Sequence, residues 1–81
     1  MTYYLVVFRS RSETMKFANL LSSYGYKTAF VNTPRQLSVS CGISAKIEKS
    51  SLIIAREILN RRQFYTFAGI YYSDNNEYIK I

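Results

Sequence analysis

The sequence predicts a ferredoxin-like α+β sandwich, with the element order βαββαβ, a four-stranded antiparallel sheet and both helices on one face. Three observations lead to this fold. Four segments alternate or run apolar as strands do, and two others carry apolar residues at helical spacing. The chain has 81 residues, of which 48% are hydrophobic, so it can build one small core and is expected to form a single domain over residues 1–81.

The first half of the chain gives the clearest pattern. Residues 3–8 are apolar on both faces, as in a central strand. Ser10-Arg11-Ser12-Glu13 fits a capping box, with Ser10 as the N-cap and Glu13 reaching back to it. The helix should run to about Tyr24, and Gly25 should close it in the left-handed conformation. Its inner face is expected to hold residues spaced at i, i+3, i+4 and i+7, namely Thr14, Phe17, Ala18 and Leu21.

The second half supplies the remaining elements. Residues 26–32 are expected to form a strand and 33–42 a loop, with one helical turn around Arg35–Leu37. Residues 43–47 alternate as a strand with one polar face. A helix capped by Ser50 or Ser51 should reach Arg61, followed by a strand over 64–72. A turn over 73–76 leads to a short extra edge strand at 78–81, and the right-handed crossover rule supports the overall order.

Composition excludes several chemistries. The single cysteine, Cys41, rules out an internal disulfide, and the absence of histidine rules out His-based catalysis and Cys/His zinc sites. The five carboxylates are scattered without ligand spacing, so no metal and no cofactor is expected. The short apolar start lacks the features of a secretory leader, and no run is long enough to span a membrane. A free thiol without a leader favours the cytoplasm.

The predicted topology gathers basic residues around the cysteine. The loops 9–12, 33–42 and 60–63 should meet at one end of the sheet, which would bring Cys41 close to Arg9, Arg11, Arg35, Arg61 and Arg62. Arginines and the helix start at Ser10 would favour the reactive thiolate. Ser38 and Ser40 could donate hydrogen bonds to sulfur or to a bound anion, and Gly42 would leave the neighbouring backbone open to a partner.

Other interpretations stay open. A lone cysteine often serves as a small buried hydrophobe, and Cys41 would then be inert. The basic loops would in that case bind a small anion or a partner protein in a regulatory role. The net charge of +6 and eight tyrosines also fit an RNA-binding module, although the strand at 43–47 lacks the aromatic residues that such domains need. Tyrosines on the face away from the helices would instead suit a homodimer.

One segment resembles a known family. The string Pro34-Arg35-Gln36-Leu37-Ser38-Val39-Ser40-Cys41-Gly42-Ile43 is similar to the signature of the selenium/sulfur carrier-like family, and the similarity extends over residues 3–47. The resemblance implies that Cys41 holds sulfur or selenium as a persulfide or selenosulfide. It also implies donor and acceptor proteins as partners, and a carrier or accessory role in preference to that of a complete enzyme.

Overall fold

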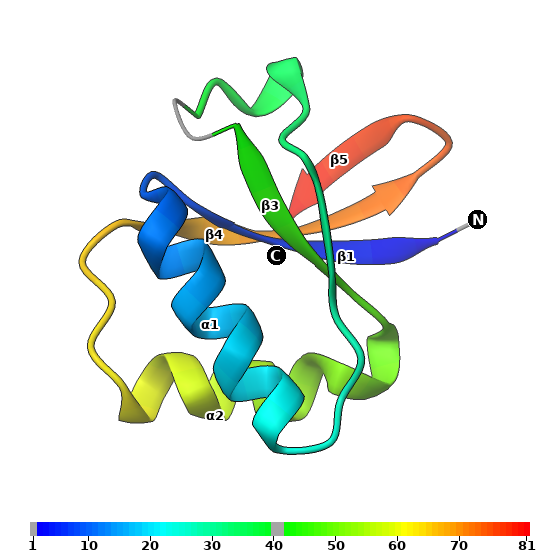
Figure 1. The fold of residues 1–81 in the computed structure, drawn as a ribbon. Helices are drawn as coiled ribbons and strands as arrows, with labels where there is room; N and C mark the ends of the chain where they lie inside the picture. The colour runs from blue at the N-terminus through cyan, green and yellow to red at the C-terminus, as the bar shows by residue number, and fades with distance from the viewer. Residues whose placement is uncertain (1, 40–41) are drawn as a thin grey trace.

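The computed structural model describes residues 2–39 and 42–81. Five antiparallel strands form one sheet in the order β2-β3-β1-β4-β5, and two helices pack on the same side of it (Figure 1). The elements in chain order are β1 (Tyr3–Phe8), α1 (Arg11–Ser23), β2 (Ala29–Asn32), η1 (Arg35–Leu37), β3 (Ile43–Ile47), η2 (Lys49–Ser51), α2 (Leu52–Arg61), β4 (Phe67–Asp74) and β5 (Glu77–Lys80). The α+β class is as predicted, and the four-stranded sheet is extended to five strands by β5, which lies at the edge close to the extra strand expected at 78–81.

β1 is the central strand, as its sequence predicts. Its side chains alternate between the two faces of the sheet, and residues Leu5 to Phe8 are all fully buried. Val6 and Phe8 point into the helix layer, where they join the core with Phe17 and Ile58. Phe8 is the hub of this core, since its ring lies 5.5 Å from Phe17 and 5.1 Å from Phe64 between centroids.

α1 buries the predicted face: Thr14, Phe17, Ala18 and Leu21. Its N-cap is Ser10, whose hydroxyl accepts a hydrogen bond from the Glu13 amide at 3.3 Å. Gly25 follows the C-cap with φ of +88°, as expected of a helix-ending glycine. The reciprocal half of the capping box is wrong, because the Glu13 carboxylate binds residues 65 and 66 and does not return to Ser10.

The C-terminal hairpin is longer than predicted: β4 continues to Asp74, so Ser73 and Asp74 are not in the turn, and β5 is Glu77–Lys80 in place of 78–81. Two strand starts also differ from the prediction, for physical reasons. β2 starts at Ala29 and not at Tyr26, because the Tyr26 amide donates to the Leu21 carbonyl and completes the end of α1. β4 starts at Phe67 and not at Phe64. The Phe64 ring packs on Phe8, and the amides of the next two residues donate to Glu13, so this segment is held against α1 outside the ladder.

Smaller differences appear around α2 and β3. Ser51 precedes α2 but makes no capping hydrogen bond, because the 3₁₀ turn η2 already gives it helical dihedral angles. Ser44, expected on a polar face of β3, is fully buried and shares a hydrogen bond with Thr33. The turn before β5 has Asn75 and Asn76 with φ of +51° and +67°, which fits the type I′ hairpin geometry that asparagine tolerates.

The face of the sheet away from the helices carries polar and aromatic residues around the buried side chains of Leu5 and Val7. The strand register places Lys46, Leu5, Tyr71 and Lys80 in one row across it, and Tyr3, Ser73 and Tyr78 in the next. Tyr4 and Tyr72 lie on the opposite, helix-bearing face, with ring centroids 5.2 Å apart. In the described parts of the chain, neither helix is long and apolar enough to cross a membrane.

Candidate functional site

The loop between β2 and β3 has a fixed base. The Thr33 amide donates to the Gly42 carbonyl at 3.0 Å, which continues the β2–β3 pairing by one step beyond Asn32 and Ile43. The Thr33 hydroxyl lies 2.7 Å from the hydroxyl of Ser44, which is buried beneath it. Two hydrogen bonds therefore hold the two ends of the loop together, and one of them is made by Gly42, the residue that follows Cys41 in the sequence.

The first part of this loop is a single 3₁₀ turn, as predicted for Arg35–Leu37. The Leu37 amide donates to the Pro34 carbonyl and the Ser38 amide to the Arg35 carbonyl, both at 3.1 Å. Ser38 then adopts the left-handed conformation with φ of +53° and redirects the chain. Arg35 and Ser38 are both exposed. The predicted site residues Ser40 and Cys41 lie outside the residues that the structure describes.

Gly42 is exposed, and its backbone does not require glycine. Its φ is outside the left-handed range, and a Cβ atom built there would meet, apart from its chain neighbours, no atom of the described residues within 4 Å. The backbone beside it is therefore open, as the sequence analysis expects. A side chain at this position would reduce access without straining the fold.

The start of α1 lies at the same end of the sheet as this loop. β3 lies between β1 and β2 in the sheet and is antiparallel to both. β1 and β2 therefore both end at the edge of the sheet where β3 begins. Arg9 and Arg11 flank the N-cap there and are exposed. Ser10 has a structural task, because its hydroxyl caps the helix and lies 2.8 Å from that of Ser12. The positive end of the helix dipole adds to the two guanidinium charges.

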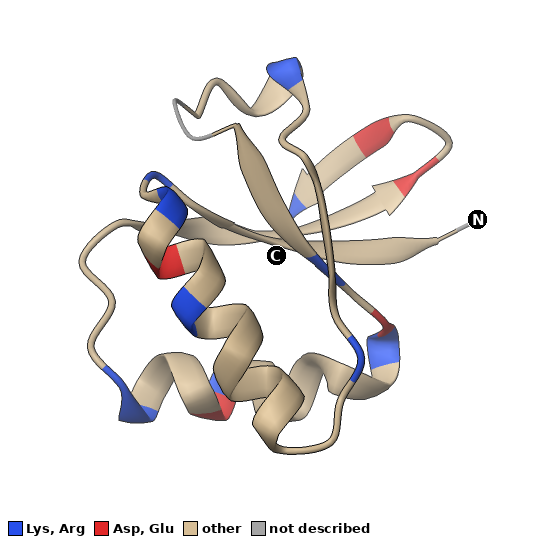
Figure 2. Cartoon of the chain, in the orientation of Figure 1, with Lys and Arg blue, Asp and Glu red and all other residues tan. Residues whose placement is uncertain are grey.

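The structure does not bring Arg61 and Arg62 to this group. These exposed residues line a small pocket with Tyr24, the residue that ends α1, whereas Arg9 and Arg11 lie at its start. A helix of 13 residues is roughly 20 Å long, which separates the two pairs. Figure 2 shows the basic end of α2 apart from the basic start of α1. The chain then returns along α1 through residues 63–66, so the prediction that Arg61 and Arg62 lie beside the Cys41 loop is wrong.

Hydrogen bonds along that return hold the segment to α1. Lys16 Nζ donates to the Gln63 carbonyl at 3.2 Å and lies 4.9 Å from the centre of the Phe64 ring. Glu13 accepts from the amides of Tyr65 at 2.8 Å and Thr66 at 2.7 Å, and from the Thr66 hydroxyl. Desolvation alone would raise the pKa of Glu13, but these hydrogen bonds outweigh it and leave the pKa below its ordinary value.

A second polar group, which no sequence pattern indicates, lies at the other end of the sheet. Tyr3, Ser73 and Tyr78 are neighbours in one row across three strands, and hydrogen bonding with Ser73 and Tyr78 lowers the pKa of Tyr3. Lys46 Nζ lies 4.6 Å from the centre of the Tyr3 ring. Only the strand register brings these residues together, so no sequence motif could have identified them. Among residues 2–39 and 42–81, no three metal-ligating side chains form a group.

Comparison with known proteins adds one result to this geometry. The model of the family described as "Putative Se/S carrier protein-like" matches residues 3–72. The chain belongs to this family. The match includes the β2–β3 loop with Cys41, and it extends beyond residue 47, where the motif-based resemblance ended, to include α2 and most of β4. No curated protein and no solved structure matches the chain.

Proposed function

We propose that this member of the selenium/sulfur carrier-like family carries one sulfur or selenium atom on Cys41. The observation that carries the proposal is the family match, which spans the Cys41-Gly42 segment together with the strands on either side of it. Cys41 is the only thiol in the chain, so any cargo held as a persulfide or selenosulfide has one place to bind.

The loading step is a thiol exchange. The Cys41 thiolate attacks the terminal sulfur of a donor persulfide, a new S–S bond forms at Cys41, and the donor S–S bond breaks. The donor leaves as a thiolate, so atoms and electrons balance without an added oxidant. With a donor selenosulfide, the same attack at selenium leaves a selenium atom on Cys41. An acceptor thiolate then removes the atom by the same reaction in reverse sense.

The described residues around this position support such a reaction. The fixed base at Thr33, Gly42 and Ser44 limits the region that the loop can explore. Arg9, Arg11 and Arg35 are exposed cations at this end of the sheet, and cations near a cysteine favour its thiolate over the neutral thiol. Open backbone at Gly42 gives a donor protein room to approach.

The composition also bears on partners. Because the chain has no second cysteine, it cannot resolve a disulfide by itself, and turnover requires the thiol of another molecule. We therefore propose separate donor and acceptor proteins that dock on the basic end, and a carrier role without a complete catalytic cycle. A labile persulfide of this kind belongs in a reducing compartment such as the cytoplasm.

The test is the rate at which the protein takes up sulfur from glutathione persulfide, followed by intact mass. The Arg9→Ala/Arg11→Ala variant and the Arg35→Ala variant should load several-fold more slowly than the wild type, because nearby charge is removed. Arg61→Ala/Arg62→Ala is the matched control. It also removes two positive charges, but at the other end of α1, and it should load at the wild-type rate. Equal rates in all variants would contradict the role given to the basic end.

A further inference from the structure

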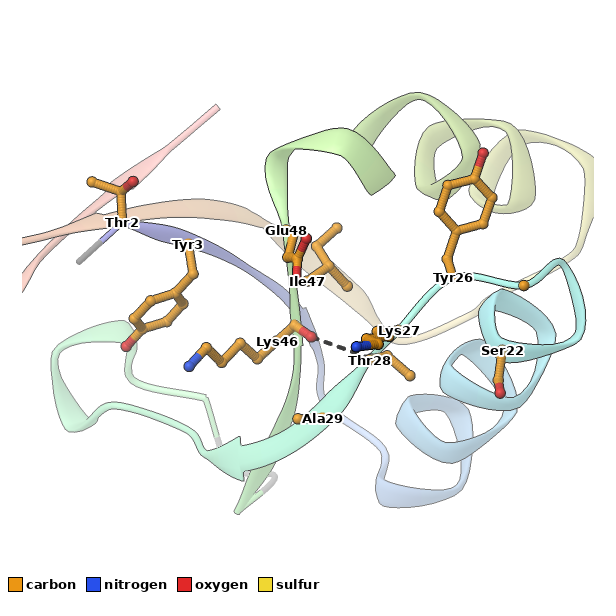
Figure 3. A pocket seen from close by; sticks show the side chains of 11 residues that line it. Thr2, Tyr3, Ser22, Tyr26, Lys27, Thr28, Ala29, Lys46, Ile47 and Glu48 are labelled. Carbon is orange, nitrogen blue, oxygen red and sulfur yellow. Dashed lines mark hydrogen bonds between the residues drawn. The ribbon is translucent and has the colours of Figure 1, made fainter.

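A groove of about 850 Å³ lies at the end of the sheet opposite the Cys41 loop. Three segments line it: the start of β1, the turn from α1 into β2, and the end of β3. Its volume falls within the range of small-molecule sites, about 300–1,000 Å³. Figure 3 shows Lys46 extending from β3 toward the Tyr3 ring, while Tyr26 and Ser22 lie on the other side of β3.

Tyr3 stands at one end of a row that crosses three strands and continues through Ser73 to Tyr78, and Ser73 is only 3% exposed. A phenol can both donate and accept hydrogen bonds, so the Tyr3 hydroxyl can donate to an oxyanion in the groove. Hydrogen bonding with Ser73 and Tyr78, together with the nearby Lys46 charge, lowers the pKa of Tyr3, which makes the phenol a better hydrogen-bond donor.

Lys46 adds a cation beside this donor. Its ammonium group lies 4.6 Å from the centre of the Tyr3 ring, in a cation–π contact, and the residue is half-buried. Lys27 also lines the groove, so the lining contains two cations and one carboxylate, that of Glu48. The carbonyls at the end of α1 accept hydrogen bonds from the amides of Tyr24, Gly25 and Tyr26, which reduces their repulsion of an anion.

We propose that this groove binds a small organic oxyanion, a carboxylate or a phosphate ester that also has an apolar part. The oxyanion group lies at the Tyr3–Lys46 end, where it accepts a charge-assisted hydrogen bond from the lysine and a second from the phenol. The apolar part lies along the remainder of the groove, whose lining includes Ile47 and, across β3, the Tyr26 ring. This site is separate from the proposed carrier reaction and does not depend on it.

The test is an NMR titration of the ¹⁵N-labelled full chain with four probes: inorganic phosphate, phenyl phosphate, acetate and benzoate. Phenyl phosphate or benzoate should bind more tightly than its partner without the ring, and shifts should be confined to amides of the groove. The comparison of the two phenyl probes then identifies the preferred oxyanion. Lys46→Gln and Tyr3→Phe should each weaken binding about tenfold, because each loses a hydrogen bond to a charged group.

Lys49→Gln is the control, since Lys49 lies outside the groove lining and its loss should leave binding unchanged. The proposal is overturned if none of the four probes shifts the groove amides, if the shifts fall at the Arg9–Arg11 end, or if Lys46→Gln and Lys49→Gln weaken binding equally. Cys41→Ser should bind the probe as the wild type does, so failure of the carrier proposal and failure of this one are distinguishable.

Discussion

The Glu13 carboxylate accepts the backbone amide of Thr66 at 2.7 Å, across 53 positions of sequence. This contact joins the first turn of α1 to the segment that leads into β4. The Arg9 amide donates to the Thr66 carbonyl at 2.8 Å, so two hydrogen bonds to Thr66 connect the end of β1 and the first turn of α1 to the start of β4. The position of Arg9 and Arg11 at this end of the sheet therefore depends on a carboxylate that the sequence pattern assigned to helix capping.

Replacing Glu13 should destabilise the protein. Glu13→Gln keeps the size but loses the charge and replaces one acceptor oxygen by a donor, so the free energy of unfolding should fall by about 1–2 kcal/mol. Urea unfolding monitored by circular dichroism measures this. Glu57→Gln, which changes an exposed carboxylate on α2, is the control and should stay within roughly 0.5 kcal/mol of the wild type. Equal effects at the two positions would show that the Glu13 contacts add no stability.

The same carboxylate should make stability depend on pH. The pKa of Glu13 is lower in the folded protein than in the unfolded chain, so the folded state favours the ionised form. Its contribution is present above the unfolded pKa and is lost as the pH falls through the folded pKa. On acidification from neutral pH, the wild type should lose more stability than Glu13→Gln. Parallel losses in the two proteins would contradict the assigned hydrogen bonds.

The N-cap of α1 offers a separate test. Ser10→Ala removes the hydroxyl that accepts the Glu13 amide, and the free energy of unfolding should fall by about 1 kcal/mol. Ser50→Ala is the matched control, because Ser50 is exposed within η2 and does not cap a helix. Thermal unfolding of both variants measures the difference. If Ser10→Ala is as stable as Ser50→Ala, the Ser10 hydroxyl does not stabilise α1 as an N-cap.

The glycines should respond differently to alanine. Gly25 has φ of +88°, so Gly25→Ala should cost about 1 kcal/mol of unfolding free energy in backbone strain. Gly69 has φ of +148°, which residues with a side chain rarely adopt, so Gly69→Ala should also lower stability through backbone strain; the Lys80 side-chain carbon 2.9 Å from the new Cβ position lies near the end of a flexible chain and can move aside. Gly42→Ala should leave stability unchanged, because that position is open and unstrained. A large loss of stability in Gly42→Ala would mean that the loop is packed more tightly than the structure shows.

Much of the first half of the fold could be predicted because its signals are local. The bounds of β1, the buried face of α1, the Ser10 cap and the Gly25 closure each depend on residues within a few positions of one another. The start of β4 could not be predicted in this way. Phe64 is a residue type that favours strands, but its ring packs in the core against Phe8 and Phe17, and the strand therefore starts later.

The candidate site follows the same division. The 3₁₀ turn at Arg35–Leu37 and the place of Arg9 and Arg11 follow from strand direction and local sequence. The positions of Arg61 and Arg62 depend on where α2 ends relative to α1, which side-chain packing decides. The row of Tyr3, Ser73 and Tyr78 requires the register of three strands, and that information is not contained in any single segment.

The central claim, that Cys41 carries sulfur or selenium, is tested most directly by the intact mass of the protein purified without reductant. We expect a fraction to carry about 32 additional mass units for one sulfur, or about 79 for one selenium, and to lose them on treatment with a thiol. Cys41→Ser should never show the addition. A wild-type protein that always has the bare mass, even after exposure to a persulfide donor, would contradict the claim.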